Sequence, residues 1–267
     1  MNESVSHLSN EATHGLGSLE VRHPPGTFAL TPASLVAVEA IGRHQGRFQG
    51  RGLDWGSGSG VLSILLGRIP AVDLVIGLEV EPANVEISRE NAVRNSVGDK
   101  VRFFESDSYS PASSEGKAAL GALEGAADFI VANPPSSSPV DDGFGYRRAV
   151  VRGAGAYLKS GGVLCLSVSR QYGTSRLMGL LDLDPRLKYA GVLSSTDWVA
   201  FDMARDDLRA DVRAYAAEEE RGGLRYAFRH PEVSGRDMSA LEALAHFERT
   251  GVSPRSQWQS HLFVREA

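Results

Sequence analysis

From about residue 52 onward, short apolar runs alternate with stretches whose apolar residues recur at helical spacing. Strands and helices that alternate in this way are typical of a parallel sheet covered by helices on both faces. The pattern therefore predicts an α/β fold with a doubly wound, mostly parallel, seven-stranded sheet. The predicted strands are 52–55, 74–79, 101–105, 127–133, 162–168, 190–193 and 261–264, and the predicted helices are 33–41, 61–69, 83–95, 116–123, 146–158 and 175–181.

Two segments depart from this alternation. Residues 1–19 are rich in Ser, Asn, His and Gly without periodicity, so we predict a flexible leader ahead of a single domain at 20–267. Near the other end, a highly charged run at 206–225 precedes a strand-like 224–228 and a helix at 238–250. We interpret 198–259 as a mainly helical insert before the last strand, a lid or substrate-facing element, and the charged run as a solvated helix face.

The amino-acid composition indicates the cellular compartment in which we expect the protein. The chain has 267 residues, 42% hydrophobic and 23% charged, which is typical of a soluble globular protein. Its single cysteine, Cys165, lies in an apolar run, so we expect a buried thiol in a reducing, cytoplasmic compartment and no disulfide framework. No apolar stretch is long enough for a membrane span. The seven histidines form no metal-type cluster with other ligands, so no metal is expected.

The net charge of the chain indicates which kind of binding partner to expect. The formal net charge is -5, whereas affinity for nucleic acid comes mostly from Lys and Arg on phosphates. We therefore expect a small-molecule or protein partner, and we do not expect nucleic acid or a membrane.

Residues 53–62 read LDWGSGSGVL, which places a glycine-rich turn between a predicted strand and a predicted helix. Glycines let the backbone approach a ligand, and a helix start offers free amide donors. Glu79 ends the next predicted strand, where doubly wound folds hold an acid on a ribose. The pair predicts an adenosine-type ligand, with a tight turn and an exposed acid as the alternative interpretation. The dinucleotide fingerprint G-x-G-x-x-G fails at Val61.

The run Asp54-Trp55-Gly56-Ser57-Gly58-Ser59-Gly60 resembles the first motif of class I S-adenosylmethionine-dependent methyltransferases. The resemblance implies that Asp54 and the glycine loop hold the methionine end of the cofactor and that Glu79 holds its ribose. It also implies that Asp107, at the end of the third predicted strand, binds the adenine amino group. A helix or turn cap is the alternative role for Asp107.

The predicted strand 127–133 ends in Asn133-Pro134-Pro135, which must lie in a loop at the carboxyl edge of the sheet. The prolines could simply end the strand, with Asn133 satisfying the turn. In this context, however, the element resembles the fourth motif of the amino-methylating branch, which includes release-factor glutamine methyltransferases and adenine-N methyltransferases. The resemblance implies that the Asn133 side chain and the carbonyl that follows it accept hydrogen bonds from the target nitrogen.

The resemblance extends from about residue 28 to 171. Residues 27–32 (TFALTP) are similar to the element before the family's first helix, and 142–147 (DGFGYR) to the stretch after the fourth motif of the glutamine methyltransferases. Ser136 departs from the pattern, because the family has an aromatic residue there that stacks on a planar amide or base. This departure argues against a planar target. The implied cofactor residues are Asp54, Gly56, Ser57, Gly58, Gly60, Glu79, Val80, Asp107, Ser108 and Asn133; the implied catalytic residues are Asn133 and Pro134, and the implied substrate residues are Phe28, Pro135, Ser136 and Tyr146.

Together these features predict an S-adenosylmethionine-dependent methyltransferase that methylates a nitrogen of a small molecule or protein side chain by direct in-line transfer. Positioning in a dry site can carry such a reaction without a metal. The alternatives are an adenine-N methyltransferase of nucleic acid, a cofactor-consuming cyclase or lyase, a nucleoside-binding regulator, and a dinucleotide oxidoreductase, which the failed fingerprint disfavours.

Overall fold

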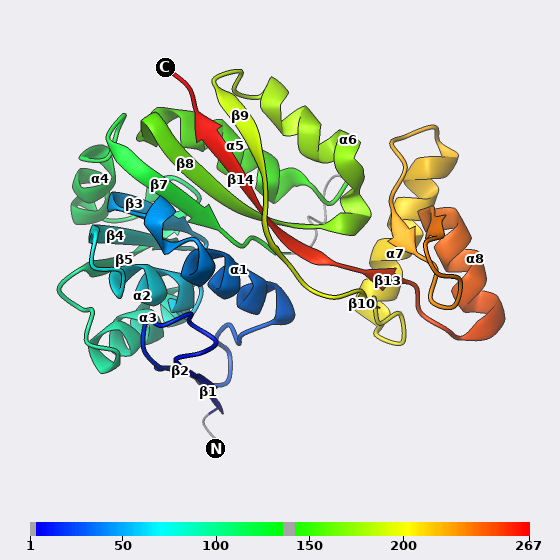
Figure 1. The fold of residues 1–267 in the computed structure, drawn as a ribbon, viewed down its shortest axis with the longest axis horizontal. Helices are drawn as coiled ribbons and strands as arrows, with labels where there is room; N and C mark the ends of the chain where they lie inside the picture. The colour runs from blue at the N-terminus through cyan, green and yellow to red at the C-terminus, as the bar shows by residue number, and fades with distance from the viewer. Residues whose placement is uncertain (1–3, 136–141) are drawn as a thin grey trace.

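The computed structural model describes residues 4–135 and 142–267, which form a central sheet flanked by helices and an appended lobe (Figure 1). The sheet has eight strands in the order β6-β5-β4-β3-β7-β8-β14-β9. Strands β3, β4, β5, β7 and β8 run parallel, and β14 lies antiparallel between β8 and β9. This confirms the doubly wound sheet, with the two-residue β6 added at one edge. The strands are β3 (Gly50–Trp55), β4 (Val72–Glu79), β5 (Val101–Asp107), β6 (Ser110–Pro111), β7 (Ala127–Ala132), β8 (Leu158–Ser169), β9 (Leu187–Ser195) and β14 (Trp258–Arg265).

Side chains of successive strand residues enter two separate cores, as the two-residue period of a strand requires. In β8, Leu164 packs with the helices α4 to α6, whereas its neighbour Cys165 packs with the helices α1 to α3. Burial raises the pKa of the Cys165 thiol to about 12, which confirms an inert core cysteine. No helix in the described part of the chain could cross a membrane. The helices are α1 (Pro32–Arg43), α2 (Val61–Gly67), α3 (Pro82–Arg94), α4 (Ser114–Gly121), α5 (Gly145–Tyr157) and α6 (Gly173–Met178).

The N-terminal residues are ordered, so the predicted flexible leader is wrong for residues 4–19. Strand β1 (Ser4–Leu8) pairs antiparallel with β2 (Leu19–His23). Leu8 and Leu16 are buried in the same core as α1 and α2. These isolated leucines show no period because a turn-rich stretch separates them, and long-range packing rather than local pattern orders the segment.

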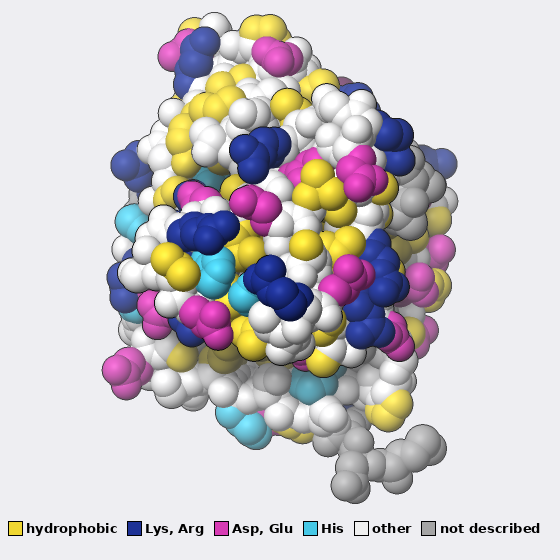
Figure 2. Space-filling view, turned by 90° about the vertical axis from the view of Figure 1, so that its right-hand side faces the viewer, with side chains coloured by type: hydrophobic (Ala, Val, Ile, Leu, Met, Phe, Trp, Pro, Cys, Tyr) yellow, Lys and Arg dark blue, Asp and Glu magenta, His cyan; other side chains and the backbone are white. Residues whose placement is uncertain are grey.

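The insert between β9 and β14 forms the lobe on the right of Figure 1. It shares a hydrophobic core with the main sheet, to which α7 contributes Val212, Tyr215 and Ala216. The space-filling view of this side shows acidic and basic side chains interspersed over its surface (Figure 2). The insert consists of α7 (Asp206–Glu220), α8 (Ala240–Thr250) and a small sheet in the order β10-β13-β11-β12, formed by β10 (Val199–Ala200), β11 (Phe228–Arg229), β12 (Asp237–Met238) and β13 (Arg255–Ser256).

Two expectations for the insert need correction. Of the predicted strand 224–228, only Phe228 lies in a strand. The carbonyls of Leu224 and Arg225 do not pair with another strand, because they accept hydrogen bonds from the Arg176 side chain. The charged run is also more than a solvated face. Glu219 accepts hydrogen bonds from the first backbone amides of α8, at Ala240 and Leu241, so it links the two helices of the insert.

Gly52 tests the packing of β3 against β7. A Cβ at this position would collide with the ring and carbonyl of Phe129 on β7. We expect Gly52→Ala to lower the free energy of unfolding by about 1–3 kcal/mol, the usual cost of overpacking. Gly121→Ala is the matched control, since its Cβ would meet no atom within 4 Å and alanine is the better helix former. Urea denaturation of both variants is the measurement, and equal stabilities would contradict the packing described here.

Candidate active site

The glycine-rich loop joins β3 to α2 through three left-handed residues. Gly56, Gly58 and Gly60 have φ values of +70°, +54° and +89°, which glycine adopts readily and other residues rarely do. The loop is tied to β4, because the amides of Gly56 and Ser57 both donate to the Leu78 carbonyl, at 2.9 and 3.0 Å. A Cβ on Gly60 would come within 2.9 Å of the Phe103 ring. Glycine therefore suits the backbone at all three positions, and at Gly60 the Phe103 ring also leaves no room for a Cβ without a shift.

Asp54, in β3 just before the loop, is fully buried and anchors α2. Its Oδ2 accepts hydrogen bonds from the Ser63 amide at 3.0 Å and the Ser63 hydroxyl at 2.7 Å. Burial raises the pKa of Asp54 to about 7, although the two hydrogen bonds from Ser63 act in the opposite direction. The carboxylate therefore joins the end of the strand to the first turn of the helix.

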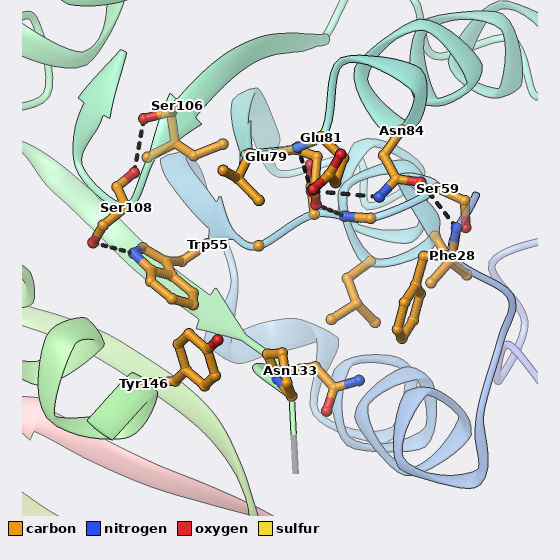
Figure 3. A pocket seen from close by; sticks show the side chains of 18 of the residues that line it. Phe28, Trp55, Ser59, Glu79, Glu81, Asn84, Ser106, Ser108, Asn133 and Tyr146 are labelled. Carbon is orange, nitrogen blue, oxygen red and sulfur yellow. Dashed lines mark hydrogen bonds between the residues drawn. The ribbon is translucent and has the colours of Figure 1, made fainter. Parts of the chain in front are cut away.

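Glu79 ends β4 and points into the space above the glycine loop (Figure 3). Its carboxylate accepts hydrogen bonds from the amides of Gly58 at 2.7 Å and Glu81 at 3.0 Å, and from Asn84 Nδ2 at 3.4 Å. Asn84 Oδ1 in turn accepts from the Phe28 amide at 2.9 Å, and the Phe28 ring lies against Gly58. One acid thus links the loop, α3 and the segment before α1.

The end of β5 forms the third side of the site. Asp107 is the last residue of the strand and Ser108 follows it with a left-handed φ of +54°. The indole of Trp55 donates to Ser108 Oγ at 3.0 Å, and Ser106 Oγ donates to the Ser108 carbonyl at 2.8 Å. These bonds fix the turn after β5 against the end of β3.

Asn133 follows β7 and is half-buried, on the side of the site opposite Glu79 (Figure 3). Its Nδ2 lies 3.5 Å from Ser34 Oγ, in the first turn of α1. Pro135 and Tyr146 line the same cavity, whereas Pro134 is buried behind it. Ser136 lies outside the described residues.

The ends of β3, β4, β5 and β7 enclose one cavity of about 540 Å³, a volume typical of small-molecule sites. Its lining unites the predicted site residues on four strands, while Asp54, Gly60 and Pro134 are buried behind the described lining. The predicted residues that line it are Phe28, Gly56, Ser57, Gly58, Glu79, Val80, Asp107, Ser108, Asn133, Pro135 and Tyr146.

The glycine loop leaves buried polar atoms for a ligand. Among the described residues, Asp54 Oδ1, Ser57 Oγ and Ser59 Oγ have no hydrogen-bond partner, and such groups are costly to bury unpaired. A Cβ on Gly56 would meet no protein atom within 4 Å, so the space beside the loop is open. These features fit the amino, carboxylate and ribose groups of the cofactor that the sequence resemblance implies.

Sequence reasoning missed several residues that hold the site together. Ser34 contacts Asn133, and Asn84 donates to Glu79. The Trp55 indole donates to Ser108. Arg147, only 2% exposed, donates to the carbonyls of Pro135 at 2.5 Å and Pro134 at 3.4 Å. The signal for Arg147 was its place in the DGFGYR stretch. Within the described residues, no three His, Cys, Asp or Glu side chains gather as a metal site requires.

The buried carboxyl of Asp54 makes stability depend on pH. Its folded-state pKa of about 7 lies above the ordinary value of 3.8, so its contribution to stability is full below about pH 4 and is lost as the pH rises through 7. Relative to Asp54→Asn, the free energy of unfolding of the wild type should fall over this range, by at most about 4 kcal/mol. Denaturant titrations at several pH values measure it, with the exposed Asp99→Asn as control. Parallel curves for wild type and Asp54→Asn would contradict the assignment.

Comparison with known proteins gives the family. A family model described as the methyltransferase small domain matches residues 18–183. A ribosomal RNA small subunit methyltransferase C from Alcanivorax borkumensis is 31% identical over 150 residues, covering 55% of this chain and 42% of its own length. A release factor glutamine methyltransferase from Chlorobaculum tepidum is 27% identical over 150 residues, covering 48% of each chain. The chain thus spans less than half the length of these relatives.

The structural comparison agrees. The structure of a Thermus thermophilus 16S rRNA N2 G1207 methyltransferase, solved with AdoMet and guanosine, has a TM-score of 0.55 at 25% identity. The match covers 71% of this chain and 47% of that protein.

These relatives overturn one expectation. The acidic balance of the chain argued against nucleic acid, yet relatives named for ribosomal RNA methylation are among the matches. Net charge sums the whole surface, whereas acceptor recognition depends on the residues around the cavity, so the exclusion was wrong. The chain belongs to the methyltransferase small domain family.

Proposed function

We propose that this enzyme methylates a nitrogen attached to a planar carbon, and that the acceptor is a base in ribosomal RNA. The observation that carries the proposal is Asn133, which stands at the end of β7 in the cavity that also holds the glycine loop and Glu79. The contact of Nδ2 with Ser34 Oγ leaves Asn133 Oδ1 as the acceptor atom toward a substrate amino group.

The proposed cofactor contacts follow the strand ends. Glu79 binds the ribose hydroxyls, Asp107 the adenine amino group, and the glycine loop with Asp54 behind it the methionine end. Val80, 56% exposed at the cavity wall, offers an apolar face to the adenine. When bound, S-adenosylmethionine supplies a methyl group on a positively charged sulfur.

The chain's contribution to the transfer is positioning. Asn133 Oδ1 and the Pro134 carbonyl accept the two N–H hydrogen bonds of the acceptor amino group, which aims its lone pair at the methyl carbon. With the cofactor bound, transfer would exchange its carbon–sulfur bond for a nitrogen–carbon bond, the electron pair staying on sulfur, and the methylated nitrogen would lose its proton to solvent. Holding the reactants in line supplies a large part of such a rate enhancement.

The lining near Asn133 favours an acceptor nitrogen that is already neutral. Among the described residues that line the cavity, the carboxylates are Glu79, Glu81 and Asp107, all at the ends of β4 and β5, and there is no imidazole. The described lining on the β7 side, where Asn133 lies, thus offers no group that could deprotonate an ammonium at neutral pH. Base amines and carboxamides need no such step. The ring of Tyr146 provides an aromatic surface for a planar acceptor, the role that Ser136 cannot perform (Figure 3).

The relatives support both planar classes, since their names specify a ribosomal RNA guanine and a release-factor glutamine. Methyl-labelled cofactor should be supplied with small-subunit RNA, release factors and a small-metabolite fraction, and the labelled nucleoside or residue identified. Label on a nitrogen of RNA supports the proposal. Label on glutamine would keep nitrogen transfer and refute the RNA acceptor, and methylthioadenosine as product would refute methyl transfer.

Asn133→Ala removes the proposed acceptor-positioning amide. We expect kcat to fall by about 100-fold, the loss typical of a misplaced reactant, while the cofactor Kd changes by less than about twofold. Single-turnover methylation and calorimetric titration measure the two quantities. Unchanged turnover with normal cofactor affinity would contradict the role of Asn133.

Glu79→Gln removes the charge proposed to hold the ribose. A charge-assisted hydrogen bond is worth roughly 1.5–3 kcal/mol, so the cofactor Kd should rise at least about tenfold. The matched control is Glu86→Gln, at an exposed position of α3, the helix that follows β4. Equal Kd values for the two variants in calorimetry would rule out the ribose contact.

A further inference from the structure

The segment after the Asn-Pro-Pro element, Asp142 to Arg147, is held by several bonds. The Asp142 carboxylate accepts two hydrogen bonds of 2.6 Å from Arg148 and one of 3.2 Å from Arg176. Burial alone would raise the pKa of Asp142, but the hydrogen bond and charge of Arg148, with hydrogen bonds from the Phe144 amide and Arg176, hold the pKa below its usual value. The segment is therefore anchored through an ionised side chain.

Arg176 connects this anchor to the insert. The residue is 3% exposed, and its guanidinium donates to Glu218 Oε1 at 2.7 Å and to the carbonyls of Leu224 and Arg225 at 2.7 and 2.9 Å. The guanidinium also lies 3.9 Å from the centre of the Tyr226 ring. A buried guanidinium needs an acceptor for each of its N–H donors, and here the insert supplies most of these acceptors.

Tyrosine hydroxyls from two elements hold the backbone of the same segment. Tyr226 of the insert donates to the Asp142 carbonyl at 2.9 Å and also contacts Glu218 Oε2. Tyr172, after β8, donates to the Gly143 carbonyl at 3.0 Å and lies 3.1 Å from the hydroxyl of Tyr215 on α7. Two successive carbonyls are thus fixed by hydroxyls that belong to the insert or contact it.

Arg147 carries this anchoring to the site. Its guanidinium lies 5.4 Å from the centre of the Tyr172 ring and donates to the carbonyls of Pro134 and Pro135, next to Asn133. Tyr146, the preceding residue, lines the cavity. A continuous series of contacts therefore runs from α7 to the element that faces the acceptor.

We propose that the insert supports the acceptor side of the cavity and that Glu218 and Tyr226 of the insert, with Arg176 of α6, are positioning residues for methyl transfer. They fix Asp142, next to Gly143, whose carbonyl Tyr172 holds, and through this segment they set Tyr146 and Arg147 against the Asn-Pro-Pro element. This inference rests on the proposed function. The inference predicts an effect on the acceptor and none on cofactor binding. The proposed cofactor side of the cavity is built from β3, β4 and β5, whereas the insert acts on the β7 side.

Tyr226→Phe and Glu218→Gln test the inference with minimal change of shape. The first removes one hydroxyl and keeps the stacked ring, and the second removes the charge opposite Arg176. We expect the kcat for methyl transfer to fall about tenfold or more in each variant, while the cofactor Kd stays within about twofold of wild type. Tyr189→Phe is the matched control, since it removes a hydroxyl bonded to His261 on the far β9–β14 edge.

Hydrogen–deuterium exchange gives a readout that does not depend on turnover. Exchange should rise in residues 142–150 of both variants and stay unchanged in the glycine loop. Unchanged kcat in the two variants, with or without faster exchange, would overturn the inference, as would a cofactor Kd that worsens in step with kcat. Failure of the proposed function is distinct: the wild type would bind cofactor and methylate no nitrogen, before any variant is compared.

Discussion

The left-handed turn at the end of β3 fixes the position of everything else in the site. Both amides at its start bond to the Leu78 carbonyl of β4, and Gly60 packs so closely against Phe103 of β5 that no side chain fits there. The end of the loop is held because the Asp54 carboxylate accepts hydrogen bonds from Ser63 in α2. One short loop thus joins three parallel strands and a helix at the edge of the sheet where ligands of such folds bind.

Strand register places the acceptor element beside this turn. Trp55, the residue before Gly56, pairs with Ala132, the residue before Asn133, so the glycine loop and the Asn-Pro-Pro element leave adjacent strands at the same level. Glu79 leaves β4 one strand further on, where Leu78 pairs with Trp55. The glycine loop, Glu79 and Asn133 therefore converge at one edge of the sheet, and in our proposal the insert and Arg147 stabilise the Asn133 side.

The sequence could predict those features that depend on residues close together in the chain. The parallel strands, the glycine loop, Glu79 and Asn133 all follow from local pattern, because strand ends of a doubly wound sheet meet at one edge. Long-range contacts were not predictable in this way. Leu8 and Leu16 are ordered by α1 and α2, and Glu218 lies in a charged run but faces a buried arginine from another element. The net charge led to the wrong expectation about nucleic acid for the same reason, because it does not say where on the surface the charges lie.

The central claim is that the Asn133 side of this cavity presents a planar nitrogen of RNA to the cofactor. The most direct measurement is a mass-spectrometric comparison of ribosomal RNA nucleosides from cells with and without the gene, followed by treatment of the deficient RNA with the pure enzyme. The account predicts one N-methylated base that is missing without the gene and restored by the enzyme. Identical nucleoside profiles, or a missing methyl group on carbon or oxygen, would contradict it.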